Sequence, residues 1–307
     1  MMKIVNFQHQ RNRRFLSMKK IIILLIVVIL LGGCQYLKLG NFGKLSAQGK
    51  VPPTEDYRKG DDGLTIKEIT GMPPKEIFEG EEFTIGMELK NSGTEDVADA
   101  KVILSALNSL YFSPYKDERL VTLAGKSRYL PEGEQEIIEF RIVNLKLQYG
   151  AKEYTQPYII ELDYPYATIA STEVCINPNI YEHMKIVKDA CDPTTISLNN
   201  QGAPVAVKKI KEYITSKGSG IYANYDIEIS NIGDGKVTDE KIIISDAVVG
   251  IRDLECTPKE VKLKEKRGTF RCSTLIERSE GVYKSIFSVK LNYNYRSEHK
   301  GSIKVKE

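Results

Sequence analysis

The stretch Phe83-Thr-Ile-Gly-Met-Glu-Leu-Lys-Asn-Ser-Gly93 decides the fold class of this chain. Apolar side chains stand at every second position from Phe83 to Leu89, which is the period of a β-strand with one buried face. The Asn-Ser-Gly that follows favours a turn, because asparagine and glycine tolerate the backbone conformations that turns need. The stretch therefore predicts a strand that ends in a turn at Gly93.

Segments with the same character lie on both sides of this stretch. Short apolar runs separated by Gly, Pro and Asn recur at a spacing typical of antiparallel sandwiches, and almost no helical period interrupts them. We therefore expect an all-β domain over residues 62–178. Its inner faces should include Ile85, Met87, Leu89, Val102, Leu104, Ile138, Phe140 and Leu162.

The second half of the chain repeats the first. The run Tyr222–Gly233 lies over the opening stretch at an offset of 140 residues, with the Asn-x-Gly turn in register. Further on, Val289–Tyr295 lies over Ile160–Tyr166 at an offset of 129 residues. Internal self-similarity of this kind indicates a duplicated structural unit. We therefore predict two tandem antiparallel β-sandwiches, the second of them over residues 203–307.

Turn and strand motifs of the first copy resemble those of a known family. They are Asn91-Ser-Gly93, Val102-Ile-Leu104, and Leu130-Pro-Glu-Gly-Glu134 leading into Ile137-Ile-Glu-Phe140. Together they resemble the cell-adhesion-related domain of bacterial and archaeal surface proteins, over residues 64–174 and 205–302. The second copy departs from the pattern, because Lys264-Glu-Lys-Arg-Gly268 replaces the Pro-Gly turn. The resemblance implies tandem immunoglobulin-like sandwiches that serve as spacer or adhesion modules, and it implies no catalytic residue.

Residues 1–33 predict an export signal or a membrane anchor helix. Met18-Lys-Lys supplies a positive start, and eleven apolar residues follow from Ile21 to Leu31. This run fits a signal peptide and is short for a membrane-spanning helix, which needs about 20 residues. Leu31-Gly-Gly-Cys34 resembles the lipobox of prokaryotic lipoproteins, so Cys34 is the predicted lipidation site. An uncleaved anchor helix is the alternative, and Met18 is the favoured translation start.

Both alternatives place the rest of the chain on the outer face of the membrane. Residues 34–61 are polar and rich in glycine, which indicates a flexible tether. The whole chain has a net charge of +3, but residues 1–33 hold six Lys and Arg and no acid. The remainder therefore carries 38 basic and 41 acidic residues, a net charge of −3. Because the basic excess belongs to the signal, no nucleic-acid partner is expected.

Four cysteines remain after Cys34, an even number in an exported chain. Such a set predicts two disulfides. Cys175 and Cys191 lie 16 residues apart, as do Cys256 and Cys272, so these two local pairs are the economical connectivity. A zinc site is the rival, but the chain has no Cys-x-x-Cys spacing. The first pair would close a junction over residues 179–202 between the two sandwiches.

One aromatic loop interrupts the first sandwich and has two interpretations. Exposed, it would be a recognition surface, because tyrosine and phenylalanine supply contact area at low entropic cost. Folded back, it would cap the sandwich, since large apolar groups are usually covered. The candidate partner-binding residues of this loop are Leu107, Leu110, Tyr111, Phe112 and Tyr115.

Motifs for catalysis are missing from the sequence. No Gly-x-Ser-x-Gly elbow, phosphate loop or dinucleotide fingerprint occurs, and the acidic clusters do not match a calcium-binding loop. We therefore predict no catalytic residue, no metal and no cofactor.

The sequence as a whole predicts a membrane-tethered protein of the cell envelope. Its partners would be the membrane, through the N-terminal lipid or helix, and another envelope protein or a surface polymer. Its role would be adhesion, protein–protein interaction or spacing. An enzyme whose active site is assembled from scattered acids and tyrosines is one alternative, and a structural subunit of a surface layer or filament is another.

Overall fold

The computed structural model describes residues 57–109, 111–114, 117–143, 147, 150–178, 191–277 and 281–307. These residues form β-strands and one short 3₁₀ helix, so the all-β prediction is confirmed. Residues Thr54–Glu307 make one compact unit. Within the described part of the chain, no helix has the length and apolar character needed to cross a membrane. The predicted signal or anchor helix and Cys34 lie outside the described residues.

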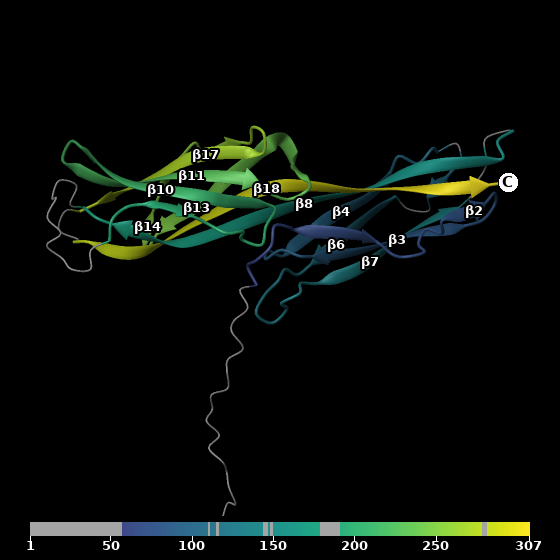
Figure 1. The fold of residues 1–307 in the computed structure, drawn as a ribbon, viewed down its shortest axis with the longest axis horizontal. Helices are drawn as coiled ribbons and strands as arrows, with labels where there is room; N and C mark the ends of the chain where they lie inside the picture. Colours follow the sequence, from purple (N-terminus) through teal and green to yellow (C-terminus); the bar gives the residue numbers. More distant parts are fainter. Residues whose placement is uncertain are drawn as a thin grey trace, which may run out of the picture. The chain divides into compact units, whose positions relative to one another are not determined.

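The strands form three sheets (Figure 1). A four-stranded sheet has the order β1-β3-β7-β5, a five-stranded sheet the order β15-β17-β11-β10-β9, and a long sheet the order β14-β13-β18-β8-β4-β6, to which β2, β12 and β16 add short pairings. Among the described strands, only β2 pairs in parallel, with β18. The strand bounds are β1 (Leu64–Glu68), β2 (Glu76–Phe78), β3 (Phe83–Asn91), β4 (Val97–Ser105), β5 (Ser113–Pro114), β6 (Glu118–Leu123), β7 (Gln135–Val143), β8 (Glu153–Ile176), β9 (Thr195–Ser197), β10 (Val205–Lys217), β11 (Gly220–Asn231), β12 (Lys236–Val237), β13 (Lys241–Val249), β14 (Arg252–Asp253), β15 (Glu255–Thr257), β16 (Glu260–Lys262), β17 (Arg267–Ile276) and β18 (Tyr283–Lys306), with the 3₁₀ helix η1 (Thr238–Glu240) before β13.

The opening stretch of the sequence forms β3, which lies between β1 and β7. Its alternate residues Ile85, Met87 and Leu89 are fully buried, as the period of two predicts. The other predicted inner-face residues are buried as well, so the predicted antiparallel sandwich core is confirmed. They are Val102, Leu104, Ile138, Phe140 and Leu162.

Strands β8 and β18 are each 24 residues long and pair in one unbroken antiparallel register. The register runs from Tyr283 opposite Ile176 to Lys306 opposite Glu153. At about 3.3 Å per residue the pair is roughly 80 Å long. Both sandwiches share it, as Figure 1 shows: the four-stranded sheet lies over one part of the pair and the five-stranded sheet over the other.

The end of each long strand lies in the sandwich formed mainly by the other copy. The last residues of β18 pair with the first residues of β8 and with β2, and their side chains Ile303 and Val305 are fully buried. In the same way, Ala167–Ile176 of β8 pair with the part of β18 that lies beside β13. The predicted division into 62–178, 179–202 and 203–307 stays a prediction, and backbone pairing crosses it.

The duplication in the sequence is also present in the hydrogen bonds. The side-chain Nδ2 of Asn91 donates to the carbonyl of Glu95 at 2.8 Å, and the side-chain Nδ2 of Asn231 donates to that of Gly235 at 2.9 Å. In the neighbouring strands, Leu64 stands opposite Asn91 and Val205 stands opposite Asn231. The two Asn-x-Gly turns are therefore built in the same way.

Candidate functional site

Four tyrosines meet at the midpoint of the long strand pair. In the β8–β18 strand pair, which we call the ladder, Tyr164 is opposite Tyr295 and Tyr166 is opposite Tyr293. Their ring centroids lie 5.8–6.3 Å apart, and all four side chains are buried. This is the distance range in which aromatic rings attract each other through tilted and edge contacts. The duplicated Tyr-x-Tyr sequence thus forms one cluster that both copies share.

Each hydroxyl of the tyrosine cluster has a partner in one of the copies. The Leu64 amide donates to the Tyr164 hydroxyl at 3.0 Å, and the equivalent Val205 amide donates to the Tyr293 hydroxyl at 3.4 Å. The Tyr295 hydroxyl donates to the Asn231 side chain at 3.1 Å. Burial raises the pKa of Tyr295 to about 12, so its phenol stays protonated at neutral pH. The hydroxyls of the cluster therefore serve as hydrogen-bonding groups that connect the strand pair to both copies.

The chain enters the compact unit beside this cluster. The Gly202 amide donates to the Gly60 carbonyl at 3.0 Å, and the Ser92 amide donates to the Gly63 carbonyl at 2.9 Å. Burial raises the pKa of Asp62 in the same segment, and the neighbouring carboxylates Asp61 and Asp234 raise it further. The segment that leads in from the predicted tether is thus attached at the middle of the strand pair rather than at one of its ends.

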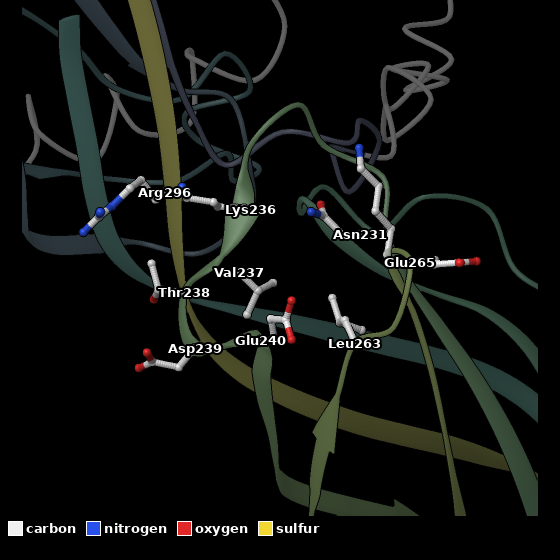
Figure 2. A pocket seen from close by; sticks show the side chains of 10 residues that line it. Asn231, Lys236, Val237, Thr238, Asp239, Glu240, Leu263, Glu265 and Arg296 are labelled. Carbon is white, nitrogen blue, oxygen red and sulfur yellow. The ribbon is translucent and has the colours of Figure 1, made fainter.

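A surface hollow of about 560 Å³ lies next to this midpoint (Figure 2). Two short turns form its walls: η1 between β12 and β13, and the turn between β16 and β17. It is lined by Asn231, Lys236, Val237, Thr238, Asp239, Glu240, Leu263, Glu265, Lys266 and Arg296.

Both turns carry non-glycine residues in the left-handed backbone region. The φ angles are 58° for Asp239, 52° for Glu240, 49° for Glu265 and 67° for Lys266. Such angles are uncommon for residues with a Cβ atom, and they gather at functional sites more often than elsewhere. This hollow is therefore the strongest candidate for a functional site among the described residues.

Backbone hydrogen bonds hold the two turns in place. The Leu263 amide donates to the Glu240 carbonyl at 3.0 Å, and the Asn231 amide donates to the Lys266 carbonyl at 2.8 Å. In Figure 2, Glu240 lies beside Val237 and Leu263, while the Asp239 carboxylate points in another direction. Within the described residues, Asp239, Glu240, Glu265 and Lys266 make no ion pair, so these charges are open to a partner.

A second hollow of about 620 Å³ shares Thr238 and Asp239 with the first. It reaches the start of β4 and the outer face of β8 and β18, and we call the two hollows together the junction groove. Burial raises the pKa of Glu95 in its wall, and Lys290 lies 3.8 Å away as the counter-charge. The second hollow is lined by Glu95, Asp96, Ala98, Pro165, Tyr166, Ala167, Thr238, Asp239, Lys241, Ile243, Lys290, Asn292, Tyr293 and Asn294.

The junction groove offers binding groups. It presents carboxylates, lysines and amides around a wide, shallow surface. Among the residues with described positions, no group of three or more His, Cys, Asp or Glu is arranged to hold a metal ion. Mixed charges on a shallow surface suit recognition of another molecule by several polar contacts.

The predicted cysteine pairs are confirmed. Disulfides join Cys175 to Cys191 and Cys256 to Cys272. The second joins β15 to the neighbouring β17. The first joins Cys175, near the end of β8, to Cys191 in the segment before β9. Two disulfides indicate an extracytoplasmic location, because they persist in oxidising compartments.

The aromatic loop is described only in part. Phe112 is buried with 1% of its surface exposed, whereas Leu107 and Tyr111 are partly buried and pack against the core. Leu110 and Tyr115 lie outside the described residues. The arrangement of the three described side chains is that of a cap on the sandwich, and a partner-binding role for this loop stays a prediction.

The junction groove was not predicted from the sequence. Its residues are ordinary charged and polar side chains, and they come from both copies. One signal was present, since Lys264-Glu-Lys-Arg makes a two-residue turn between strands without the glycine or asparagine that such turns favour. A turn that keeps charged residues at positive φ is a site to inspect for function.

The buried carboxylate of Glu212 links β10 to the end of β8 and to the segment before β9. Glu212 on β10 is 5% exposed, and its carboxylate accepts hydrogen bonds from the amides of Cys175 at 3.2 Å and Thr194 at 3.3 Å. Its second oxygen and the buried Tyr225 hydroxyl have no hydrogen-bond partner among the residues that the structure describes. Burial raises the pKa of Glu212, and the two backbone amides oppose that shift only in part.

We expect Glu212→Gln to change how stability depends on pH. Because the folded-state pKa of Glu212 lies above its ordinary value of 4.5, its protonated form is favoured in the fold. The part of the unfolding free energy that depends on protonated Glu212 is fully present below pH 4.5. It is lost as the pH rises through the raised pKa, and the loss is about 1.4 kcal/mol for each unit by which folding raises the pKa. The variant should therefore become more stable relative to wild type as the pH rises from 4.5 to 8. Urea unfolding across that range, with the exposed Glu255→Gln as the control, measures this, and a pH-independent difference would contradict it.

Comparison with known proteins does not assign a family. No family model matches the chain, and no curated protein is similar to it. Among solved structures, the E. coli chaperone DraB is 12% identical, with a TM-score of 0.20, over 68% of this chain and 86% of that chain. The Salmonella enterica SafA pilin in complex with the SafB chaperone is 10% identical, with a TM-score of 0.20, over 72% of this chain and 93% of that chain. The YadV chaperone is 8% identical, with a TM-score of 0.20, over 78% and 99%. Similarities at this level carry no argument about function, and the likeness to the cell-adhesion-related domain stays a resemblance.

Proposed function

We propose that this chain is a membrane-tethered protein of the cell envelope whose joined sandwiches bind another envelope protein or a surface polymer. The observation that carries the proposal is the unbroken pairing of β8 with β18 through both sandwiches. The pairing passes through both sandwiches without a linker between them, so we propose that the two sandwiches act as one stiff unit. A stiff unit of this kind presents a binding surface at a defined position.

The place where the chain enters the unit supports a presenting role. The described chain begins at Tyr57, and Gly60 and Gly63 bind backbone amides beside the midpoint of the ladder. A tether attached there leaves both ends of the ladder free. The junction groove lies near the same midpoint, and we propose it as the surface that contacts the partner.

Intact mass spectrometry of the membrane-extracted protein tests the anchoring. We expect a chain that begins at Cys34, carries added acyl mass, and gains the mass of four hydrogens when the two disulfides are reduced. An unprocessed N-terminus would contradict the lipoprotein proposal and favour an anchor helix. A chain released without detergent would contradict tethering itself.

Cross-linking in intact envelopes tests the binding surface. Lys241 and Lys290 line the junction groove and can react with an amine-specific reagent that does not cross the membrane. We expect cross-links from these lysines to another envelope component, and we expect Asp239→Lys with Glu240→Lys to abolish them. Lys284, which pairs with Glu173 at 2.7 Å on the same long sheet, lies outside the groove lining, and Lys284→Gln is the matched control. Cross-links that persist in the groove variant would contradict a role for the groove.

A further inference from the structure

The shared ladder creates two equivalent open strand edges. On β8, strand β4 pairs with residues 159–163 only, and among the described residues no strand pairs with the remaining outer edge from Ala167 to Glu173. On β18, β12 pairs as far as Arg296 and β2 begins at Lys304. The repeat offset of 129 places Ile169 and Ser171 of β8 over Glu298 and Lys300 of β18.

The backbone groups of the β8 edge point away from β18 at odd-numbered positions. Pro157 and Pro165 stand at odd positions, and neither has an N–H to donate to the ladder. The Cys175 amide also points outward, because it donates to Glu212 at 3.2 Å. The backbone groups of Ile169, Ser171 and Glu173 therefore face outward, along an edge to which another strand can add.

The two edges differ in how they are protected. Glu298 and Lys300 on the open β18 edge are charged, and charged side chains are a common means of preventing strand addition. The equivalent positions on β8 are Ile169 and Ser171, which are uncharged. Ile169 is 39% exposed although it is a large apolar residue. One edge is thus protected against pairing, and its counterpart in the same chain is not.

We propose that the β8 edge from Ala167 to Glu173 pairs with the same edge of a second copy of this chain. The pairing would be antiparallel about a two-fold axis at Ala170, and it would join the two long sheets into one. Two-fold dimers are the commonest closed assemblies, and each partner contributes the same surface. The proposal rests on the proposed function in one respect, because tethering to one membrane raises the effective concentration of the copies.

The charges along the edge fit a second copy. Antiparallel pairing about Ala170 places Ile169 opposite the partner's Ser171 and Ala167 opposite the partner's Glu173. No like charges stand opposite each other in this register, and Glu173 keeps its ion pair with Lys284 at 2.7 Å. Like charges in directly opposite positions would oppose pairing. The edge is therefore complementary to itself.

Sedimentation of the full chain in detergent micelles tests the proposal, with proline variants at equivalent positions of the β8 and β18 edges. We expect wild type to form a reversible dimer and Ser171→Pro to weaken the dimer at least about tenfold. The proline should fold, because it takes the same outward-facing backbone position as Pro165. Lys300→Pro on the protected β18 edge and Ser171→Ala are the matched controls, and both should remain dimeric.

A second variant keeps the test decisive if the proline disturbs folding. Ile169→Lys places a charge at the position where β18 carries Glu298, and it should also produce monomers while the far-ultraviolet circular dichroism stays that of wild type. A wild-type chain that is monomeric at every concentration would overturn the proposal. So would a dimer that both β8 variants leave unchanged. Either result leaves the proposed envelope function intact, because that function is judged by cross-links from the junction groove to another component.

Discussion

Replacing Gly93 with alanine is expected to destabilise the fold by at least about 3 kcal/mol. A Cβ atom at this position would lie 1.8 Å from the Tyr166 hydroxyl oxygen. It would also lie 2.7 Å from the carbonyl oxygen of Asp62 and 2.8 Å from that of Gly202. Two of these three atoms belong to the backbone and cannot rotate away. Urea unfolding of the variant against wild type measures the loss.

Two further variants identify the cause of this loss. Gly220→Ala is the control, because its Cβ would meet the flexible ends of Leu275 and Tyr222 at 3.0 and 3.1 Å, and we expect a loss below about 1 kcal/mol. The double variant Gly93→Ala with Tyr166→Phe removes the contact with the hydroxyl and should recover part of the loss. A Gly93→Ala variant as stable as Gly220→Ala would show that the turn does not pack against the tyrosine cluster.

Replacing Val305 with aspartate is expected to unfold the sandwich formed mainly by the first copy. Val305 is fully buried, stands opposite Tyr154 on β8 and pairs with Ile77 on β2. A carboxylate buried there without a partner would destabilise the fold by about 3–5 kcal/mol. Hydrogen exchange gives the location of the effect, and we expect protection to be lost first in β2 and in the first half of β8.

This experiment distinguishes a strand pair that both sandwiches share from two domains that fold independently. If residues 203–307 folded alone, a change at Val305 would affect only those residues. Loss of protection confined to that half would therefore contradict the exchange of strand ends. Lys304→Gln is the matched control, since Lys304 is only partly buried and its ion pair with Glu153, at the surface, contributes little. The control should keep the protection pattern of wild type.

Local patterns in the sequence predicted the strands and the core correctly. The period of two over Phe83–Leu89 depends only on neighbouring side chains pointing to opposite faces, which holds in any strand. The cysteine pairs were predictable for a similar reason, because both loops are short. The repeat between Tyr222–Gly233 and the opening stretch predicted that two turns would share one structure, and the hydrogen bonds of Asn91 and Asn231 agree.

Long-range pairing was beyond such patterns. The Tyr-x-Tyr motif occurs twice in the sequence, beginning at Tyr164 and at Tyr293, but no local pattern predicts that the two motifs meet in one cluster. Buried apolar residues alternate along β18 from Phe287 to Tyr295 and again at Ile303 and Val305, but the pattern does not say which sandwich each part completes. The left-handed backbone of Asp239 and Lys266 also has no local signal, because charged residues occur at ordinary turns as well. The junction groove therefore emerged only in three dimensions.

The sequence by itself predicted that this chain is all-β, that it is duplicated, that eight named side chains lie in the core, and that two local pairs are the economical pairing of four cysteines. These properties follow from interactions between residues close in sequence and from the burial of one strand face. Only the tertiary structure decided that β8 and β18 run through both sandwiches, which leaves one edge of β8 open and brings the junction groove together. The reason is that backbone hydrogen bonding is the same for every residue type, so the choice among possible strand partners is made by the packing of the whole unit.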